Sequence, residues 1–197
     1  MLPFSDIHTH TPGRPGSILS VPAERVSLVV AANGNKPAEE QQYYSIELHP
    51  WHLTEGSIEN FLHVVNQYHE DPHFVAIGEC GLDGLCPTPI NLQLDAFRTA
   101  LRSATSLQKP VIIHCVKLWN EVMAEARPFM RPAPDDREPP LPFIIHGFRK
   151  GPQLARQLLS AGFSISIGAH HHPEIPIIVP AHRLYHETDE IICNFAP

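Results

Sequence analysis

Two histidines near the start of the chain have the spacing of a metal chelate. His8 and His10 lie in the segment Asp-Ile-His-Thr-His, within a short extended pattern. Residues two apart in a β-strand point to the same side, so both imidazoles are able to reach one cation. Because histidine is a common ligand of divalent transition metals, the pair predicts part of a metal site.

Three further groups of the same kind follow other short apolar runs. Glu79 ends one run, and His114 and His146 each follow a run of isoleucines and precede a turn. A carboxylate at the end of a buried strand is costly unless it is paired or metal-bound, although such a residue is also free to emerge into solvent. A single histidine in this context is usually a satisfied core residue. Its repetition favours metal binding.

A second carboxylate is expected near the end of the chain. Glu187 and Asp189 lie in His-Glu-Thr-Asp and share the same parity, so their spacing does not say which one points inward. Four histidines and two carboxylates suit two divalent cations bridged by a carboxylate and a hydroxide. Such a pair activates water and holds the attacking and leaving oxygens of a phosphoester.

The elements that must position these residues alternate between short β-branched runs and helical patterns, which is typical of βαβ units and a parallel sheet. Eight such strands close a barrel, whose active site lies at the carboxyl ends of the strands. The expected strands are 3–8, 25–31, 43–48, 74–79, 110–114, 142–146, 163–168 and 183–188, and the expected helices are 57–68, 90–107, 117–126 and 151–161.

The predicted fold class is therefore α/β, a TIM-like (β/α) barrel of eight strands with reduced or missing outer helices. Residues 11–24 and 32–42 are rich in proline, glycine and polar residues, which predicts loops or short turns in place of the first two crossover helices. The 197 residues suit a single domain, 1–197, and are fewer than the roughly 250 of a typical barrel. Uncovered strand faces would expose apolar surface, which predicts a homo-oligomer.

Composition narrows the function classes. The formal net charge of −7 argues against a broad basic face for nucleic acid, although bound cations would supply positive charge for a phosphate. No apolar run approaches the roughly 20 residues of a membrane span, so no membrane association is expected. The four cysteines lack disulfide or CxxC spacing, and the N-terminal residues lack a leader pattern, which together predict reduced thiols and a cytoplasmic location.

The order of these motifs resembles the TatD family of metal-dependent deoxyribonucleases, within the amidohydrolase-like barrels, and the likeness runs through most of the chain. DIHTH is similar to the family's DxHxH, LHPW (48–51) to its GxHP segment, and GECGLD to its GExGLD. KPVIIHC resembles its PVxxHxR strand, IIHGF its HCFSG, and HETDE its ETDxP.

The resemblance implies six metal ligands in two groups bridged by Glu79: His8, His10 and Asp189 hold one ion, and His114 and His146 hold the other. It also implies that Asp189 accepts the proton of the attacking water. His49 is implied to lie near the substrate phosphate without being a principal ligand.

Departures from the family pattern fall on the substrate side of the site. The arginine expected two residues after His114 is Val116, and Lys117 follows as a substitute without the bidentate guanidinium. Arg149 lies in the altered HGFRK segment, so Lys117 and Arg149 are the candidate phosphate contacts. Trp51 and Trp119 follow strand-end histidines, where packing at the rim is the favoured interpretation and stacking on a base is the alternative.

The predicted function is a metal-dependent hydrolase of ester bonds, a phosphodiesterase or deoxyribonuclease that uses a metal-bridged hydroxide on DNA or a small phosphodiester. Two alternatives stay open: a hydrolase of a small phosphoester, amide or lactone, and a metal-binding barrel that serves as an interaction module without catalysis. Two divalent ions are expected. Histidine-rich coordination suits Zn²⁺ or Mn²⁺, and the family's phosphodiester chemistry suggests Mg²⁺.

Overall fold

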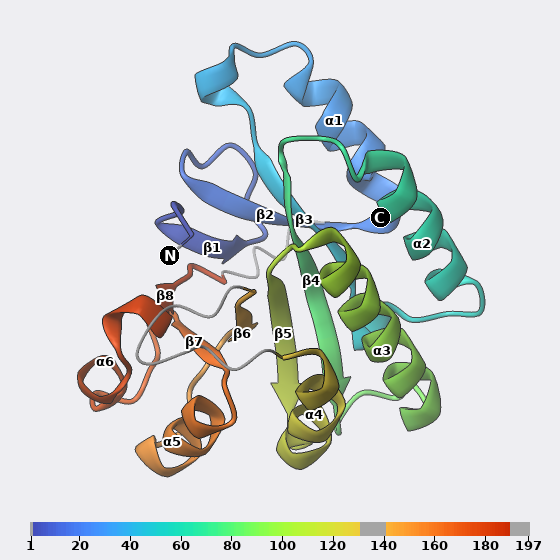
Figure 1. Ribbon diagram of the computed structural model, residues 1–197. Helices are drawn as coiled ribbons and strands as arrows, with labels where there is room; N and C mark the ends of the chain where they lie inside the picture. The colour runs from blue at the N-terminus through green and yellow to red at the C-terminus, as the bar shows by residue number, and fades with distance from the viewer. Residues whose placement is uncertain (1, 131–140, 190–197) are drawn as a thin grey trace.

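A computed structural model of the chain describes residues 2–130 and 141–189. All eight strands are parallel and pair in chain order within one sheet, as Figure 1 shows. The strands are β1 (Asp6–Thr9), β2 (Ser17–Pro22), β3 (Tyr43–Leu48), β4 (Phe74–Asp83), β5 (Val111–Val116), β6 (Phe143–Ile145), β7 (Ser164–Ile167) and β8 (Leu184–His186). The sheet curls into a nearly closed barrel, which confirms the predicted fold class.

Helices lie outside the curved sheet (Figure 1). They are α1 (Val26–Asn33), α2 (Ser57–Tyr68), α3 (Ile90–Leu107), α4 (Trp119–Ala126), α5 (Pro152–Ser160) and the short α6 (Ile175–Ile178). In α2, Phe61, Val64 and Val65 are buried and Leu62 and His63 between them are exposed, so one stripe faces the sheet. Among the described residues no helix combines the length and apolar character needed to cross a bilayer.

The outer layer is thin in two places. Between β1 and β2, residues 10–16 contain no helix, and between β7 and β8 the only α-helix is the four residues of α6. This bears out the expectation of reduced outer helices. The second crossover is different, because it contains α1 and the short 3₁₀ turns Ala23–Arg25 and Ala38–Glu40.

The strand predicted over 25–31 is wrong. Residues Val26–Asn33 form α1, and β2 instead lies at Ser17–Pro22, within a stretch predicted to be a loop. A valine-rich run of this length does not distinguish a strand from an apolar helix by periodicity. Pro22 and the 3₁₀ turn after it end β2, and the chain then enters α1 directly.

Apolar side chains are buried in two separate clusters. The larger one joins strand residues with residues of α1–α6 and fills the space between the barrel and its outer helices. The smaller one contains only strand residues and therefore lies inside the barrel: Ile7, Ile18, Ala76, Ile112, Ile144 and Tyr185. Ile112 and Ile144 each precede a predicted site histidine by two positions, so the interior changes from apolar to polar toward the carboxyl ends of the strands.

Hydrogen bonds between β1 and the residues after β8 close the barrel near the carboxyl ends of these two strands. The backbone N–H of Asp189 donates to the carbonyl of His8 at 3.3 Å. Thr188 donates to the carboxylate of Asp6 through its hydroxyl, at 2.7 Å, and through its backbone N–H, at 3.2 Å. These bonds bring the residues that follow β8 next to β1.

An irregularity in β4 directs Glu79 into the barrel. The strand continues to Asp83 and does not end at Glu79 as predicted, because its register against β5 shifts between Ile77 and Cys80 by one extra residue. Gly81 has φ +145°, and a Cβ at this position would overlap the carbonyl oxygen of His114. Glycine is therefore required where β4 approaches β5.

We expect Gly81→Ala to destabilise the protein by about 2 kcal/mol or more in free energy of unfolding, because the added Cβ must displace the β5 backbone. Urea denaturation measures the change. Gly151→Ala is the matched control, since Gly151 has φ −76° and nothing lies within 4 Å of an added Cβ. Equal stabilities of the two variants would contradict this account of β4.

Candidate metal centre

Glu79 is the centre of a cluster of histidines inside the mouth of the barrel. Its carboxylate is buried, and one oxygen lies 2.6 Å from His146 Nε2, 2.8 Å from His114 Nδ1 and 3.1 Å from His49 Nε2. The other oxygen lies 3.4 Å from His8 Nε2. Four imidazoles from β1, β5 and the residues that follow β3 and β6 thus face a single carboxylate.

His8 of β1 and His10, which directly follows β1, also face Asp189. His8 Nε2 lies 3.7 Å from Asp189 Oδ1, and His10 Nε2 lies 3.9 Å from both Asp189 Oδ1 and Glu79 Oε2. Glu187, the alternative left open by the sequence, is turned away and accepts a hydrogen bond from the backbone N–H of Gly147 at 2.6 Å. Asp189 is therefore the second carboxylate of the cluster.

Three overlapping groups of ligand atoms in the described residues are compact enough to hold a metal ion: His8, His10 and Glu79; His8, His146 and Asp189; and His49, Glu79 and His114. Together they contain the six ligands that the family resemblance implies. They also include His49, which the resemblance placed beside the substrate. The geometry thus makes His49 a candidate ligand as well.

Within the part of the chain that the structure describes, the cluster leaves a buried ring nitrogen without a protein partner, which a bound metal ion would satisfy. His8 is completely buried, yet neither of its ring nitrogens has a hydrogen-bond partner among the described residues. A buried imidazole without a partner is costly, and a cation in the cluster would satisfy Nε2. His10 and Asp189 are the more accessible members, with side chains 32% and 19% exposed, so the cluster opens toward solvent on their side.

Charge within the cluster is concentrated on Glu79. Burial would raise the pKa of this carboxyl, but the charge of His146 and hydrogen bonds from His114, His146 and His49 hold the pKa well below its usual range. Burial opposes protonation of His146, yet Glu79 raises the pKa of His146 to about 9. Burial and repulsion from His8 lower the pKa of His10 to about 4. The carboxylate thus attracts positive charge, which a divalent cation would also supply.

Three further carboxylates lie behind the histidines, each near a ring nitrogen that points away from Glu79. Asp83 Oδ2 lies 2.9 Å from His114 Nε2, Glu187 Oε1 lies 3.9 Å from His146 Nδ1, and Glu47 Oε1 lies 4.0 Å from His10 Nδ1. Carboxylates in this position fix the orientation and tautomer of metal-binding histidines. At 2.9 Å, the contact of Asp83 with His114 is the shortest of the three.

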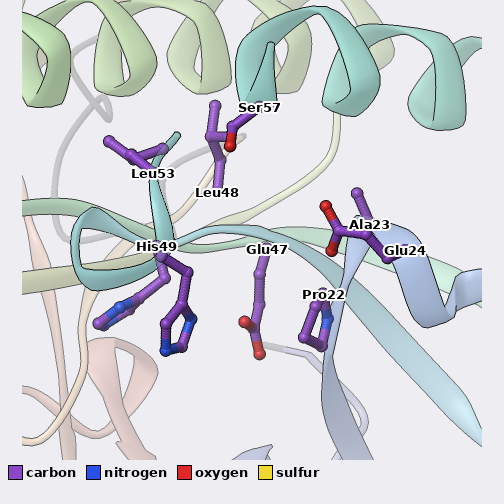
Figure 2. Close-up of a pocket in the computed structure, with 9 residues that line it drawn as sticks. Pro22, Ala23, Glu24, Glu47, Leu48, His49, Leu53 and Ser57 are labelled. Atoms are coloured by element: carbon purple, nitrogen blue, oxygen red, sulfur yellow. The ribbon is translucent and has the colours of Figure 1, made fainter. Parts of the chain in front are cut away.

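The sequence analysis did not assign a role to Asp83 or Glu47. Asp83 shares the parity of Glu79, but the predicted strand ended before it. Glu47 is on β3, two residues before His49, and Figure 2 shows both side chains on the same side of the strand, at a small pocket that also includes Pro22. Burial raises the pKa of Glu47, and the charge of Glu79 adds to the effect.

The two predicted phosphate contacts differ in position. Arg149 is exposed and its Nη2 lies 3.8 Å from Asp189 Oδ2, at the open side of the cluster. Lys117 directly follows β5, is exposed, and is not among the residues gathered around Glu79.

Comparison with known proteins adds independent findings. A family model described as TatD related DNase matches residues 20–190. Among curated proteins, the 3'-5' ssDNA/RNA exonuclease TatD of Erwinia billingiae is 33% identical over 153 residues, which are 72% of this chain and 55% of that protein. The protein of the same name from Pantoea ananatis is 31% identical over 168 residues, 78% of this chain and 61% of its own. The chain thus spans little more than half the length of these relatives.

Solved structures share the fold. A TatD homologue from Escherichia coli superposes with a TM-score of 0.69 at 22% identity and covers 88% of this chain and 66% of its own. A hydrolase of the TatD family from Entamoeba histolytica has a TM-score of 0.68 at 21% identity, with coverage of 88% and 60%. With a family model that matches most of its length, the chain belongs to the TatD-related DNases.

Proposed function

We propose that the chain is a metal-dependent phosphodiesterase that acts on single-stranded nucleic acid. The observation that carries the proposal is the buried Glu79 carboxylate surrounded by four imidazoles, with Asp189 at its open side. The two bacterial relatives named as exonucleases of single-stranded DNA and RNA support the choice of substrate.

The cluster contains enough candidate ligands for two divalent cations. We assign His8, His10 and Asp189 to one ion, His114 and His146 to the other, and Glu79 to both, with His49 close enough to join the second. When bound, two such ions lower the pKa of a coordinated water and neutralise the charge that develops on a phosphodiester. Zn²⁺ and Mn²⁺ suit the histidines, and Mg²⁺ suits the reaction.

Protein groups have the remaining tasks. Asp189 is the accessible carboxylate of the site, so we assign it as the acceptor of the proton from the attacking water. Arg149 lies beside it and presents a guanidinium that is able to bind two phosphate oxygens at once. Lys117 is assigned to the substrate strand farther from the cluster.

Two further parts of the proposal concern the whole chain. The eight described strands form one sheet, which supports a single domain over 1–197. Cys80, Cys86 and Cys115 are free thiols, which is compatible with the proposed cytoplasmic location.

Cleavage of end-labelled single- and double-stranded DNA and RNA, with Mg²⁺, Mn²⁺ and Zn²⁺ in turn, tests the activity. We expect shortening of single strands by the wild type, loss of activity when EDTA removes the metal, and loss of both activity and calorimetric metal binding in Glu79→Ala. His63→Ala is the control, because His63 is an exposed histidine of α2 outside the cluster.

A Glu79→Ala protein with full activity would refute the assigned site. Hydrolysis of bis-p-nitrophenyl phosphate without any cleavage of oligonucleotides would instead identify an enzyme for small phosphoesters. Metal binding with neither activity would favour the barrel without catalysis.

Asp83→Asn is expected to weaken metal binding by about 10- to 100-fold, because His114 loses the carboxylate that orients it. Isothermal titration calorimetry with Zn²⁺ or Mn²⁺ measures the affinity. Asp95→Asn is the matched control, since Asp95 is an exposed carboxylate of α3 whose contact is a surface pair with Arg98. Wild-type affinity in Asp83→Asn would rule out the orienting role.

We also propose that the chain self-associates through the face that contains α1. This helix is apolar on most sides, Leu28 is 67% exposed, and Leu62 of α2 is 45% exposed. Light scattering at micromolar concentration is expected to give about twice the 22.0 kDa of one chain, and Leu28→Glu is expected to return the mass to one chain. A wild-type monomer would refute the proposal.

A further inference from the structure

Trp51 is a large aromatic side chain that stays half exposed at the active end of the barrel. It lies in the 3₁₀ turn Pro50–His52, directly after β3 and two residues after His49, and 49% of it is accessible to solvent. Tryptophan is highly buried on average in folded proteins, so the exposure of Trp51 is larger than usual. Its position, next to a candidate metal ligand, places this surface at the carboxyl ends of the strands.

The Nε1 edge of the indole is hydrogen-bonded, while 49% of the side chain stays accessible to solvent. Trp51 Nε1 donates to Asp83 Oδ2 at 2.7 Å, and the same oxygen lies 2.9 Å from His114 Nε2. Asp83 is buried, and its other carboxylate oxygen accepts a hydrogen bond from the backbone of Leu85. The backbone N–H of Trp51 also donates to His49 Nδ1 at 3.3 Å, which leaves His49 Nε2 directed at Glu79. One buried carboxylate thus separates the indole from the metal cluster.

A second exposed apolar residue, Leu85, is held by the carboxylate that anchors the indole. Leu85 is 58% exposed, and its backbone N–H donates to the other oxygen of Asp83 at 2.8 Å. Thr88 donates to the carbonyl of Pro50 at 2.7 Å, which holds the loop after β4 against the turn that contains Trp51. The Trp51 side chain and the Leu85 backbone are therefore hydrogen-bonded to the same carboxylate, and both residues keep large exposed apolar side chains.

Trp119 shows the opposite arrangement. It is partly buried, and its ring contacts Phe148 edge to face with 6.3 Å between the centroids. Its apolar surface is used in the packing of α4. The interpretation as a packing residue at the rim therefore suits Trp119 but not the more exposed Trp51.

We propose that Trp51 is the stacking site for a nucleobase of the substrate, held beside the metal centre by Asp83. This inference rests on the proposed action on nucleic acid and adds the part of the substrate that the metals do not contact. A base in a duplex is already stacked on its neighbours, whereas a base of a single strand or a frayed end is free to stack on an indole. The site therefore selects single-stranded over paired substrate without reading the base edges.

Steady-state kinetics with two substrates test the site: a single-stranded oligonucleotide, and a strand of the same length in which tetrahydrofuran abasic units replace the nucleosides. Trp51→Ala is expected to raise KM for the first substrate by about 5- to 150-fold, the range for loss of one base–aromatic stack. The same variant is expected to leave KM for the abasic strand within about twofold of wild type. Trp51→Phe keeps a ring without the N–H donor and is expected to retain most of the affinity.

Equal increases of KM on both substrates would overturn the proposal, because they would indicate a merely structural role. Loss of affinity in Trp51→Phe as large as in Trp51→Ala would also overturn it, because the bond to Asp83 would then account for the whole effect.

Fluorescence separates this inference from the proposed function. In Trp119→Phe, Trp51 is the only tryptophan, so its emission is expected to be quenched by oligothymidylate and to be unchanged by the abasic strand of equal length. Quenching by oligothymidylate alone would support the stacking site even if no cleavage of nucleic acid were found. Active enzyme with Trp51 emission unaffected by either strand would overturn the stacking site and leave the proposed function intact.

Discussion

The arrangement of the active end of this barrel depends on a buried negative charge. Glu79 is enclosed by protein, and a carboxylate in that position is stable only if positive charge or hydrogen-bond donors surround it. Four histidines on different parts of the chain meet that requirement. The outward ring nitrogens of the cluster then need partners of their own, and carboxylates on β3, β4 and the segment after β8 lie behind those of His10, His114 and His146. The central carboxylate thus positions the histidines, and the outer carboxylates orient three of those histidines.

Much of this arrangement could be predicted from the sequence, because in a parallel barrel strand ends converge. An apolar run followed by a histidine or acid marks such an end without knowledge of the pairing, so His8, Glu79, His114 and His146 were identified, and α2 and α3 were predicted with their observed bounds. The TatD pattern added Asp189, which parity alone could not separate from Glu187.

The remainder depended on contacts that spacing does not encode. The strand over 25–31 was predicted from its valines and proved to be a helix, because β-branched residues also occur on apolar helices. β2 was missed because prolines and glycines flank it. Asp83 was missed because the predicted strand ended at Glu79, whereas the extra residue in β4 allows the strand to continue. The role of Trp51 depends on its bond to Asp83, and the exposure of its ring is visible only in the folded chain.

The metal centre lies across the contact between β1 and the residues after β8, so a bound cation would help to hold the barrel closed. Thr188 and Asp6 are separated by 182 positions in the chain, and candidate ligands lie beside both: His8 and His10 on one side, Asp189 on the other. A cation held between them would act as a removable crosslink between β1 and the residues that follow β8. Because a ligand that binds only the folded state stabilises it in proportion to the logarithm of its concentration, the resistance of this barrel to opening would follow the supply of metal around it.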